Sequence, residues 1–413
     1  MFPVSAIEQT LREVVERLAP LDRTPCSPGE RQAAEWLAQR LGAAGAPALL
    51  EDEPSWGTFP PTSTGLGLAG VAAALLVLRG HRAAGALLAG AGTAGVLDEA
   101  QNGPRVLRRL LRRRRRTVNV IATAGDAVAE RTLVVLAHHD APQSGVIFDQ
   151  TLQRKVYERW PGWIGTAKTP LPQWWIGLAG PLCTVVAALT GRRAPARVGA
   201  AIGAIGAALV ADVWRNDTVQ GANDNLSGAA ALVALAELLR EHSPPGLRVL
   251  LVSCGAEETL QDGIRAFLTR HRSRLDAART LFVNLDTVGS PHLVMLEAEG
   301  PIWMEDYSGP WLRDLLAACA DRLGIDLERG FRARASTDSV IPSRAGYPTA
   351  TLVSITDWRS PANYHLQSDV PANLDYGVVA DAVRLVRELI GELAAGAGER
   401  VPAAGEEGAT VAS

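Results

Sequence analysis

The sequence predicts an α/β protein with a mainly parallel, mixed central sheet flanked by helices on both faces, into which two apolar helical hairpins are inserted. Short apolar runs alternate with segments of helical periodicity along most of the chain, a pattern typical of a parallel sheet covered on both faces. Two long uncharged stretches interrupt that alternation. We therefore expect a single domain over residues 1–393, with hairpins at residues 60–97 and 169–213, and a disordered tail at residues 394–413.

The N-terminal region predicts two helices. Apolar residues recur at helical spacing from Ile7 to Leu18. A second helix is expected to begin at Pro28, because Ser27 can cap it and Glu30 follows at the spacing of a capping box.

The remaining elements of the domain are read from apolar runs and their lengths. We expect strands at Val118–Ala122, Leu133–Ala137, Leu247–Ser253, Thr280–Leu285 and Ala350–Ile355. Helices are expected at Ala229–Leu239, Trp311–Leu323 and Tyr376–Leu393.

The two insertions share one design, in which two apolar segments are joined by a short basic turn. Residues 60–78 and residues 169–190 carry no charge, and each is followed by a basic turn and a second, shorter apolar segment. A helix needs about 20 apolar residues to span a bilayer, so one member of each pair reaches that length. Gly199, Gly203 and Gly206 suit close helix contacts in lipid, and Trp174–Trp175 suits a membrane interface.

Two interpretations of the hairpins stay open. They span a membrane, or they are buried or interfacial hairpins of a soluble protein. The paired occurrence and the tryptophans favour the membrane.

Composition excludes several other classes. With 41 basic and 44 acidic residues, the net charge of −3 leaves no basic field to hold nucleic acid. The four cysteines lie far apart, which argues against a disulfide framework and against a thiolate zinc site. Glu8 and Glu13 come early and no apolar run follows a basic start, so we expect no cleaved signal peptide.

Polar side chains gather where predicted strands end, which is where ligands bind in an open α/β sheet. In chain order they are His138 and Asp140, Asp224, the adjacent Glu257 and Glu258, Asp286, and His365. Each could be a helix cap or a solvated loop residue on its own, but together they form a coherent ligand set. Carboxylate and imidazole ligands without thiolates suit zinc, or less often manganese or cobalt. Two metals about 3.5–4 Å apart could share one carboxylate.

Strand alternation separates the two adjacent histidines. It places His138 and Asp140 on one side and His139 on the other. Asp140 could then fix the tautomer of His138 from behind the metal.

Five motifs together resemble one family. AHHD, GANDNLSG, AEE, NLDTVG and YHLQSD occur in the order found in the di-zinc aminopeptidase family of metallopeptidase clan MH, which includes glutamate carboxypeptidase-like branches. The likeness covers most of residues 4–393 outside the hairpins. It implies a zinc-peptidase α/β/α sandwich, two Zn²⁺ ions per chain, a peptide substrate, and aminopeptidase-type hydrolysis of peptide bonds by a metal-bridged water.

The resemblance also implies a role for each residue. His138 and Asp286 would hold one zinc, Glu258 and His365 the other, and Asp224 would bridge them, with a cis peptide to Asn225. Catalytic roles fall to Glu257, as general base and acid, and to Asp140, which orients His138.

The chain departs from the family pattern at three points. His139 stands where the family usually has an aromatic residue, and Ser339 where it commonly has histidine. His138 and Asp224 are about 85 residues apart, much farther than usual, because the second hairpin lies between them. Substrate preference therefore stays open. So do two alternatives: a glutaminyl cyclase-like enzyme with one zinc, and a catalytically silent receptor or scaffold of the same fold.

Basic residues predict the membrane orientation. Both hairpins leave the domain and return to it, so they would enter from the same membrane face. That face carries Arg105, Arg108, Arg109, Arg112–Arg116, Lys155, Arg159, Lys168 and Arg215, whereas the opposite turns carry Arg79, Arg82, Arg192, Arg193 and Arg197. Because basic residues are enriched on the cytoplasmic side, we expect a multi-pass protein with its catalytic domain in the cytoplasm.

Overall fold

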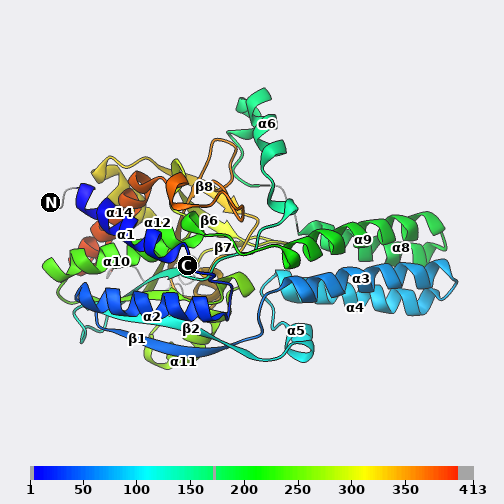
Figure 1. The fold of residues 1–413 in the computed structure, drawn as a ribbon, viewed down its shortest axis with the longest axis horizontal. Helices are drawn as coiled ribbons and strands as arrows, with labels where there is room; N and C mark the ends of the chain where they lie inside the picture. The colour runs from blue at the N-terminus through cyan, green and yellow to red at the C-terminus, as the bar shows by residue number, and fades with distance from the viewer. Residues whose placement is uncertain (1–3, 171–173, 399–413) are drawn as a thin grey trace, which may run out of the picture.

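The computed structural model describes residues 4–170 and 174–398. These residues form a nine-stranded mixed sheet in the order β1-β2-β4-β3-β5-β9-β6-β7, with β8 paired to β6 (Figure 1). Helices flank the sheet on both faces, and two hairpins project from one end as a bundle (Figure 1). The predicted fold class is confirmed.

The four central strands are parallel. They are β4 (Arg248–Cys254), β3 (Thr132–His138), β5 (Thr280–Leu285) and β9 (Thr349–Ile355). Their carboxyl ends therefore meet at one edge of the sheet, where the motif residues follow them. All seven residues of β3 are buried, as expected for a strand covered on both faces.

The outer strands complete the sheet with mixed directions. On one side, β1 (Ala48–Ser55) and β2 (Arg115–Gly125) pair antiparallel, and β2 is antiparallel to β4. On the other side, β6 (His292–Glu299) is antiparallel to β9 and to β7 (Glu305–Asp306), and parallel to β8 (Leu327–Ala333). The sequence did not predict β1, β6, β7 or β8, because three of them carry charged residues at alternate or adjacent positions and β7 has only two residues.

Strand alternation divides the core into two layers. Leu133, Val135 and Ala137 of β3 face the larger core, which packs against α1 (Val4–Leu18), α2 (Pro28–Ala43), α10 (Ser227–Glu241), α12 (Pro310–Leu323) and α14 (Tyr376–Ala394). Val134 and Leu136 face the opposite layer, which includes α11 (Asp262–His271) and borders α13 (Val340–Arg344).

The chain ends show one confirmation and one difference. The side chain of Ser27 accepts the backbone N–H of Glu30 at 3.1 Å, so the predicted cap of α2 is present. At the C-terminal end, α14 reaches Ala394, and the Arg131 side chain donates to the carbonyls of Leu393 and Ala397. The Arg131 side chain thus holds the backbone at residues 394–398, the start of the predicted tail. Residues 399–413 lie outside the described residues.

The hairpins form four helices. The first comprises α3 (Pro60–Leu78) and α4 (Arg82–Ala100), and the second α8 (Trp175–Thr190) and α9 (Arg193–Arg215). They lie side by side in the bundle (Figure 1). Small residues allow the close contact: a Cβ added to Gly67 would lie 2.9 Å from the Cβ of Ala207, and one added to Gly199 would lie 2.7 Å from the carbonyl oxygen of Gly180.

The longer member of the second hairpin differs from the one expected. Among the described residues, α3 with 19 residues and α9 with 23 are long and apolar enough to cross a membrane. Helix α8 has only 16 residues, because it begins at Trp175, whereas α9 extends beyond its apolar segment at both ends.

Three short helices lie where the bundle joins the domain. Helix α5 (Val106–Leu111) lies on one side of the bundle, and α6 (Thr151–Arg159) with α7 (Pro161–Ile164) on the other (Figure 1). We call α5, α6 and α7 the collar helices. They place exposed apolar side chains beside basic ones, and the sequence did not predict them.

Candidate metal centre

The motif residues come together at the carboxyl edge of the sheet. His138 ends β3, Glu257 and Glu258 follow β4, and Asp286 follows β5. Asp224 precedes α10, and His365 lies in the loop after β9. Five elements distant in sequence thus supply one cluster.

Asp224 stands between the two imidazoles. Its Oδ1 is 3.2 Å from Nε2 of His138, and its Oδ2 is 3.1 Å from Nε2 of His365. Glu258 Oε1 lies 3.5 Å from the same nitrogen of His365. The Asp224–Asn225 peptide is cis, as the resemblance implied.

Ligand atoms fall into two groups that share Asp224. Those of His138, Asp224 and Asp286 lie within 4.8 Å of one another, and so do those of Asp224, Glu258 and His365. A third group of the same size joins His138 to Glu257 and Glu258. The two groups sharing Asp224 contain the same residues as the two sets that the resemblance implied, and their role as ligands stays a prediction.

The buried carboxylates at this edge of the sheet need positive charge close by to be ionised together. Burial raises the pKa of Asp286 to about 7, and burial with the charges of Asp224 and Glu257 raises the pKa of Glu258 well above its usual value. Burial also opposes ionisation of Asp224, but the close approach of the His138 and His365 imidazoles holds its pKa below the usual range. Buried carboxylates this close can all be ionised only beside positive charge.

The donor set fits zinc. The buried Nε2 of His365 lies close to the Asp224 and Glu258 carboxylates, but it makes no aligned hydrogen bond in the part of the chain that the structure describes. Imidazole nitrogen and carboxylate oxygen are ordinary zinc ligands, and a shared carboxylate suits a pair of ions.

Asp140 does more than face His138. Its Oδ1 lies 3.4 Å from Nδ1 of His138, on the ring side away from Asp224. The same carboxylate accepts the backbone N–H of Glu257 and of Glu258, each at 3.0 Å. Asp140 therefore orients one ligand and fixes the loop that carries another ligand and the predicted general base.

His139 points away from the cluster, as predicted. Its Nδ1 lies 2.9 Å from Oγ of Ser253, and burial lowers the pKa of His139 to about 4. The ring is therefore neutral at physiological pH and is a structural side chain.

Glu257 is buried and held by one neutral partner. Burial raises its pKa well above the usual value, and Nε2 of Gln261 donates to its Oε1 at 2.8 Å. A carboxyl group with a raised pKa can both take and return a proton near neutral pH.

Three supporting residues were missed or only partly seen in the sequence. Arg23 is fully buried and donates to the carbonyls of His139 at 2.9 Å and Gln220 at 2.8 Å. The Asp369 carboxylate accepts the N–H of Asn223 at 2.7 Å and of Asp224 at 3.1 Å. Asp369 could have been found from its place in the YHLQSD motif, whereas nothing local marks Arg23 or Gln261.

The loop after β8 borders the site only in part. Ser336 and Thr337 line a cavity beside the metal ligands. Ser339 is instead fully buried, where it accepts a 2.6 Å hydrogen bond from the Thr351 hydroxyl.

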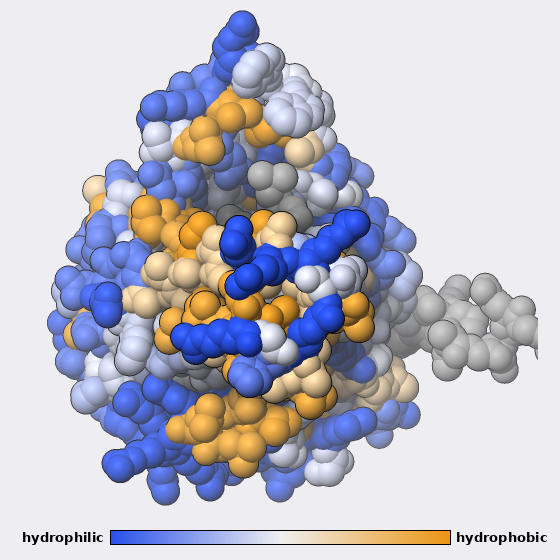
Figure 2. Space-filling view, turned by 90° about the vertical axis from the view of Figure 1, so that its right-hand side faces the viewer, coloured by the Kyte–Doolittle hydropathy of each residue, from blue (hydrophilic) through white to orange (hydrophobic). Residues whose placement is uncertain are grey.

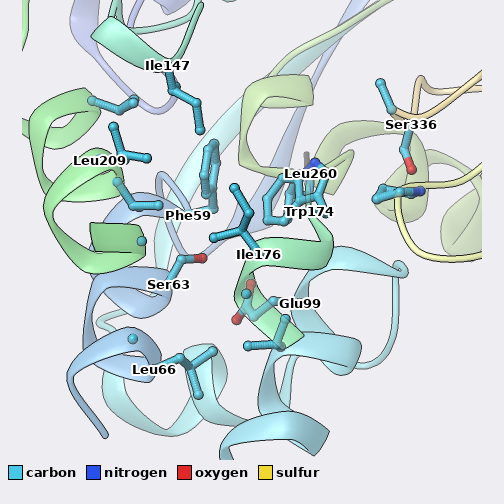
Figure 3. A pocket seen from close by; sticks show the side chains of 18 of the residues that line it. Phe59, Ser63, Leu66, Glu99, Ile147, Trp174, Ile176, Leu209, Leu260 and Ser336 are labelled. Atoms are coloured by element: carbon cyan, nitrogen blue, oxygen red, sulfur yellow. The ribbon is translucent and has the colours of Figure 1, made fainter. Parts of the chain in front are cut away.

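Two cavities border the cluster and share Glu257, Glu258 and Tyr364 in their walls. One, of about 180 Å³, is also lined by His138, Asp224 and Asp286. The other, of about 230 Å³, extends from His365 between helices α3, α8 and α9 (Figure 3).

The fold and site define a metal-dependent hydrolase of α/β type. Residues 206–390 match the family model described as Peptidase family M28. This match agrees with the resemblance to the zinc aminopeptidase family. A search of curated proteins found no match.

Solved structures share the fold at low sequence identity. A leucine aminopeptidase precursor from Bacteroides thetaiotaomicron has a TM-score of 0.54 at 15% identity, over 93% of this chain and 96% of that one. A Zn-dependent exopeptidase from Parabacteroides distasonis has a TM-score of 0.52 at 14% identity, over 93% and 97%. A glutaminyl cyclase from B. thetaiotaomicron has a TM-score of 0.53 at 14% identity, over 93% and 97%. The family-model match supports zinc-dependent hydrolysis of peptide bonds.

Proposed function

We propose that this chain is a membrane-embedded, aminopeptidase-type exopeptidase that works with two zinc ions. The observation that carries the proposal is Asp224, whose two oxygens face His138 and His365 separately. Each imidazole has a further carboxylate beside it, Asp286 in one group and Glu258 in the other.

The residues divide the reaction between them. Bound zinc would polarise the scissile carbonyl and lower the pKa of a water. Glu257 takes the proton from that water and passes it to the leaving amine, while Gln261 holds its Oε1. Asp140 keeps Glu257 and Glu258 in place through their backbone N–H groups.

The cyclase alternative has a specific basis, since a glutaminyl cyclase shares the fold. The presence of two complete ligand groups that share Asp224 favours the hydrolase. The experiment is metal analysis of purified protein, followed by assays of aminoacyl and dipeptide substrates and of N-terminal glutamine peptides. Two zincs with chelator-sensitive hydrolysis support the proposal. One zinc with pyroglutamate formation contradicts it.

Membrane insertion is supported by the surface of the bundle. Only 33% of the apolar window of α3 and 28% of that of α9 is buried, which is little for core helices. Seen end-on, the bundle has hydrophilic side chains at its tip with hydrophobic surface around them (Figure 2). Those basic tip residues are Arg79, Arg82, Arg192 and Arg193.

The collar helices fit a membrane interface. Leu110 and Leu111 of α5 are 75% and 74% exposed, and Trp163 of α7 is 69% exposed. Basic residues flank them in both segments. Exposed leucine and tryptophan beside arginine suit the headgroup region.

We further propose that the catalytic domain faces the cytoplasm. The prediction rests on the excess of basic residues at the collar. Arg105 and Arg108, however, pair with Asp262 and Glu99 in the interior, so they add little surface charge.

Cysteine labelling tests insertion and orientation together. Val128→Cys lies on the catalytic domain, where Val128 is 90% exposed, and His81→Cys lies at the bundle tip. In intact cells, a membrane-impermeant maleimide should label His81→Cys above the parent chain's background and spare Val128→Cys. The reverse result contradicts the orientation, and extraction of the protein by carbonate contradicts insertion.

A further inference from the structure

The larger cavity joins the helix bundle to the metal centre. Its volume is about 230 Å³, and its wall includes Glu257, Glu258 and His365 at one end. Phe59, Ile176 and Leu209 are among the side chains that surround its interior (Figure 3). An apolar space inside the inserted helices therefore opens onto the reacting groups.

Glycines keep this space open. A Cβ added to Gly70 or Gly206, both in the cavity wall, would find its nearest neighbour at 3.7 Å, an ordinary contact distance. Packing therefore does not require glycine at these positions, although glycine is a poor helix former. Larger side chains there would enter the cavity.

Arg334 lines both cavities, so it lies where they meet. In the rest of the larger cavity, away from the metal ligands, the wall offers no free charge to a ligand. Glu99 lines the wall, but its carboxylate is buried in an ion pair with Arg108. A charged substrate group beside these apolar side chains would thus lose its hydration without gaining an opposite charge. A hydrocarbon chain would lose nothing.

We propose, on the basis of the proposed hydrolase function, that this cavity binds a hydrocarbon chain attached next to the scissile amide, so that the substrates are amphiphiles. An engineered cavity of about 150 Å³ holds benzene. On that scale 230 Å³ holds roughly nine carbon atoms, about twice a leucine side chain. This hydrocarbon chain of the substrate can be a long side chain of its N-terminal residue or a fatty acyl group on the nitrogen of the scissile amide.

Two substrate series distinguish these sources. One is a set of 2-amino acid anilides with linear side chains of increasing length, and the other is N-acyl alanines with increasing acyl length. In one series, kcat/KM should rise about threefold to fourfold per added methylene, the factor for burying a CH₂ group, and level off at roughly nine carbons. The series that rises identifies the source, and a flat response beyond leucine length in both overturns the proposal.

A cavity-filling variant tests the location. Gly206→Leu should cut kcat/KM for the longest substrates at least tenfold and change it by less than threefold for the shortest. Gly90→Leu is the matched control, because Gly90 lies in the same bundle with no atom within 4 Å of an added Cβ. An unchanged chain-length profile in Gly206→Leu, or the same loss in Gly90→Leu, contradicts the proposal.

A binding measurement separates this inference from the proposed function. The probe is octanoate, whose eight carbons fit the cavity; isothermal titration calorimetry should show that it binds the wild-type protein in nanodiscs beyond its uptake by empty nanodiscs. Gly206→Leu should weaken this binding at least tenfold relative to Gly90→Leu. If binding follows this pattern but no amide is cleaved, the cavity assignment stands and the hydrolase proposal fails. If amides are cleaved but the probe binds all three proteins equally, the cavity assignment fails.

Discussion

Replacing Asp140 by Asn tests how the metal centre is held together. The two carboxylate oxygens accept the N–H groups of Glu257 and Glu258, each at 3.0 Å, and one of them also faces Nδ1 of His138. An asparagine has one oxygen and one NH₂ group. In either orientation its NH₂ group would therefore face the backbone N–H of Glu257 or of Glu258, and that hydrogen bond would be lost.

The size of the effect follows from the bond lost. A hydrogen bond to a charged group contributes about 1.5–3 kcal/mol, or roughly 10-fold to 150-fold in an equilibrium. Loss of a group that orients a ligand usually weakens metal binding about 10–100-fold. We therefore expect Asp140→Asn to weaken zinc binding about 10–100-fold. Even at saturating zinc, kcat should fall at least about 10-fold, because Glu257 is displaced.

The assay measures zinc affinity by competition with a chromophoric chelator, and turnover at saturating zinc. Asp126→Asn is the matched control, because Asp126 also accepts two backbone N–H groups, those of Val128 and Gly246, each at 3.2 Å. Asp126 lies at the opposite end of the sheet, next to the first residues of β3 and β4. If Asp140→Asn stays within twofold of wild type on both measures, or if the control loses as much, the assigned role is wrong.

Three further predictions follow from the same geometry. His138→Ala should lose zinc and activity, whereas His139→Ala should keep zinc. Metal analysis of both variants checks this, and the reverse result would show that the two histidines have been assigned the wrong way round. Asp369→Asn should weaken zinc binding about tenfold, because Asp369 holds the backbone of Asp224, and chelator competition within twofold of wild type would refute it. Burial raises the pKa of Glu299 to about 8. The stability that protonated Glu299 contributes is therefore fully present below its unfolded pKa near 4.3 and is lost as pH rises towards 8. Glu299→Gln should therefore raise Tm at pH 8 by several degrees and change it little at pH 4, and a gain of equal size at both pH values would contradict the reasoning.

The sequence indicated the clustered residues better than the side chains that hold them in place. Each of the five residues lies beside a recognisable element, and the family resemblance then grouped them: His138, Asp224, Glu258, Asp286 and His365. The bonds from the Asp140 carboxylate to a loop more than 100 residues away depend on the register of β3 and β4, which no local pattern reveals.

The fold was predictable where strands are buried and apolar. Central strands such as Leu133–Ala137 could be read directly, because both of their faces are covered. Strands β1 and β8 expose charged residues at the sheet edges and resemble loops in sequence. The cavity was not predictable, because it arises from the packing of α3 against α9, which only the tertiary structure sets.

The central claim is that the two residue groups sharing Asp224 would each hold a zinc ion and that Glu257 moves the proton. Its most direct test is zinc content and turnover measured together on the wild-type protein and on Glu257→Gln. The account predicts two zinc ions per chain in both, with turnover at least about 100-fold lower in the variant. A single zinc in the wild-type protein, or near-normal turnover in Glu257→Gln, would contradict it.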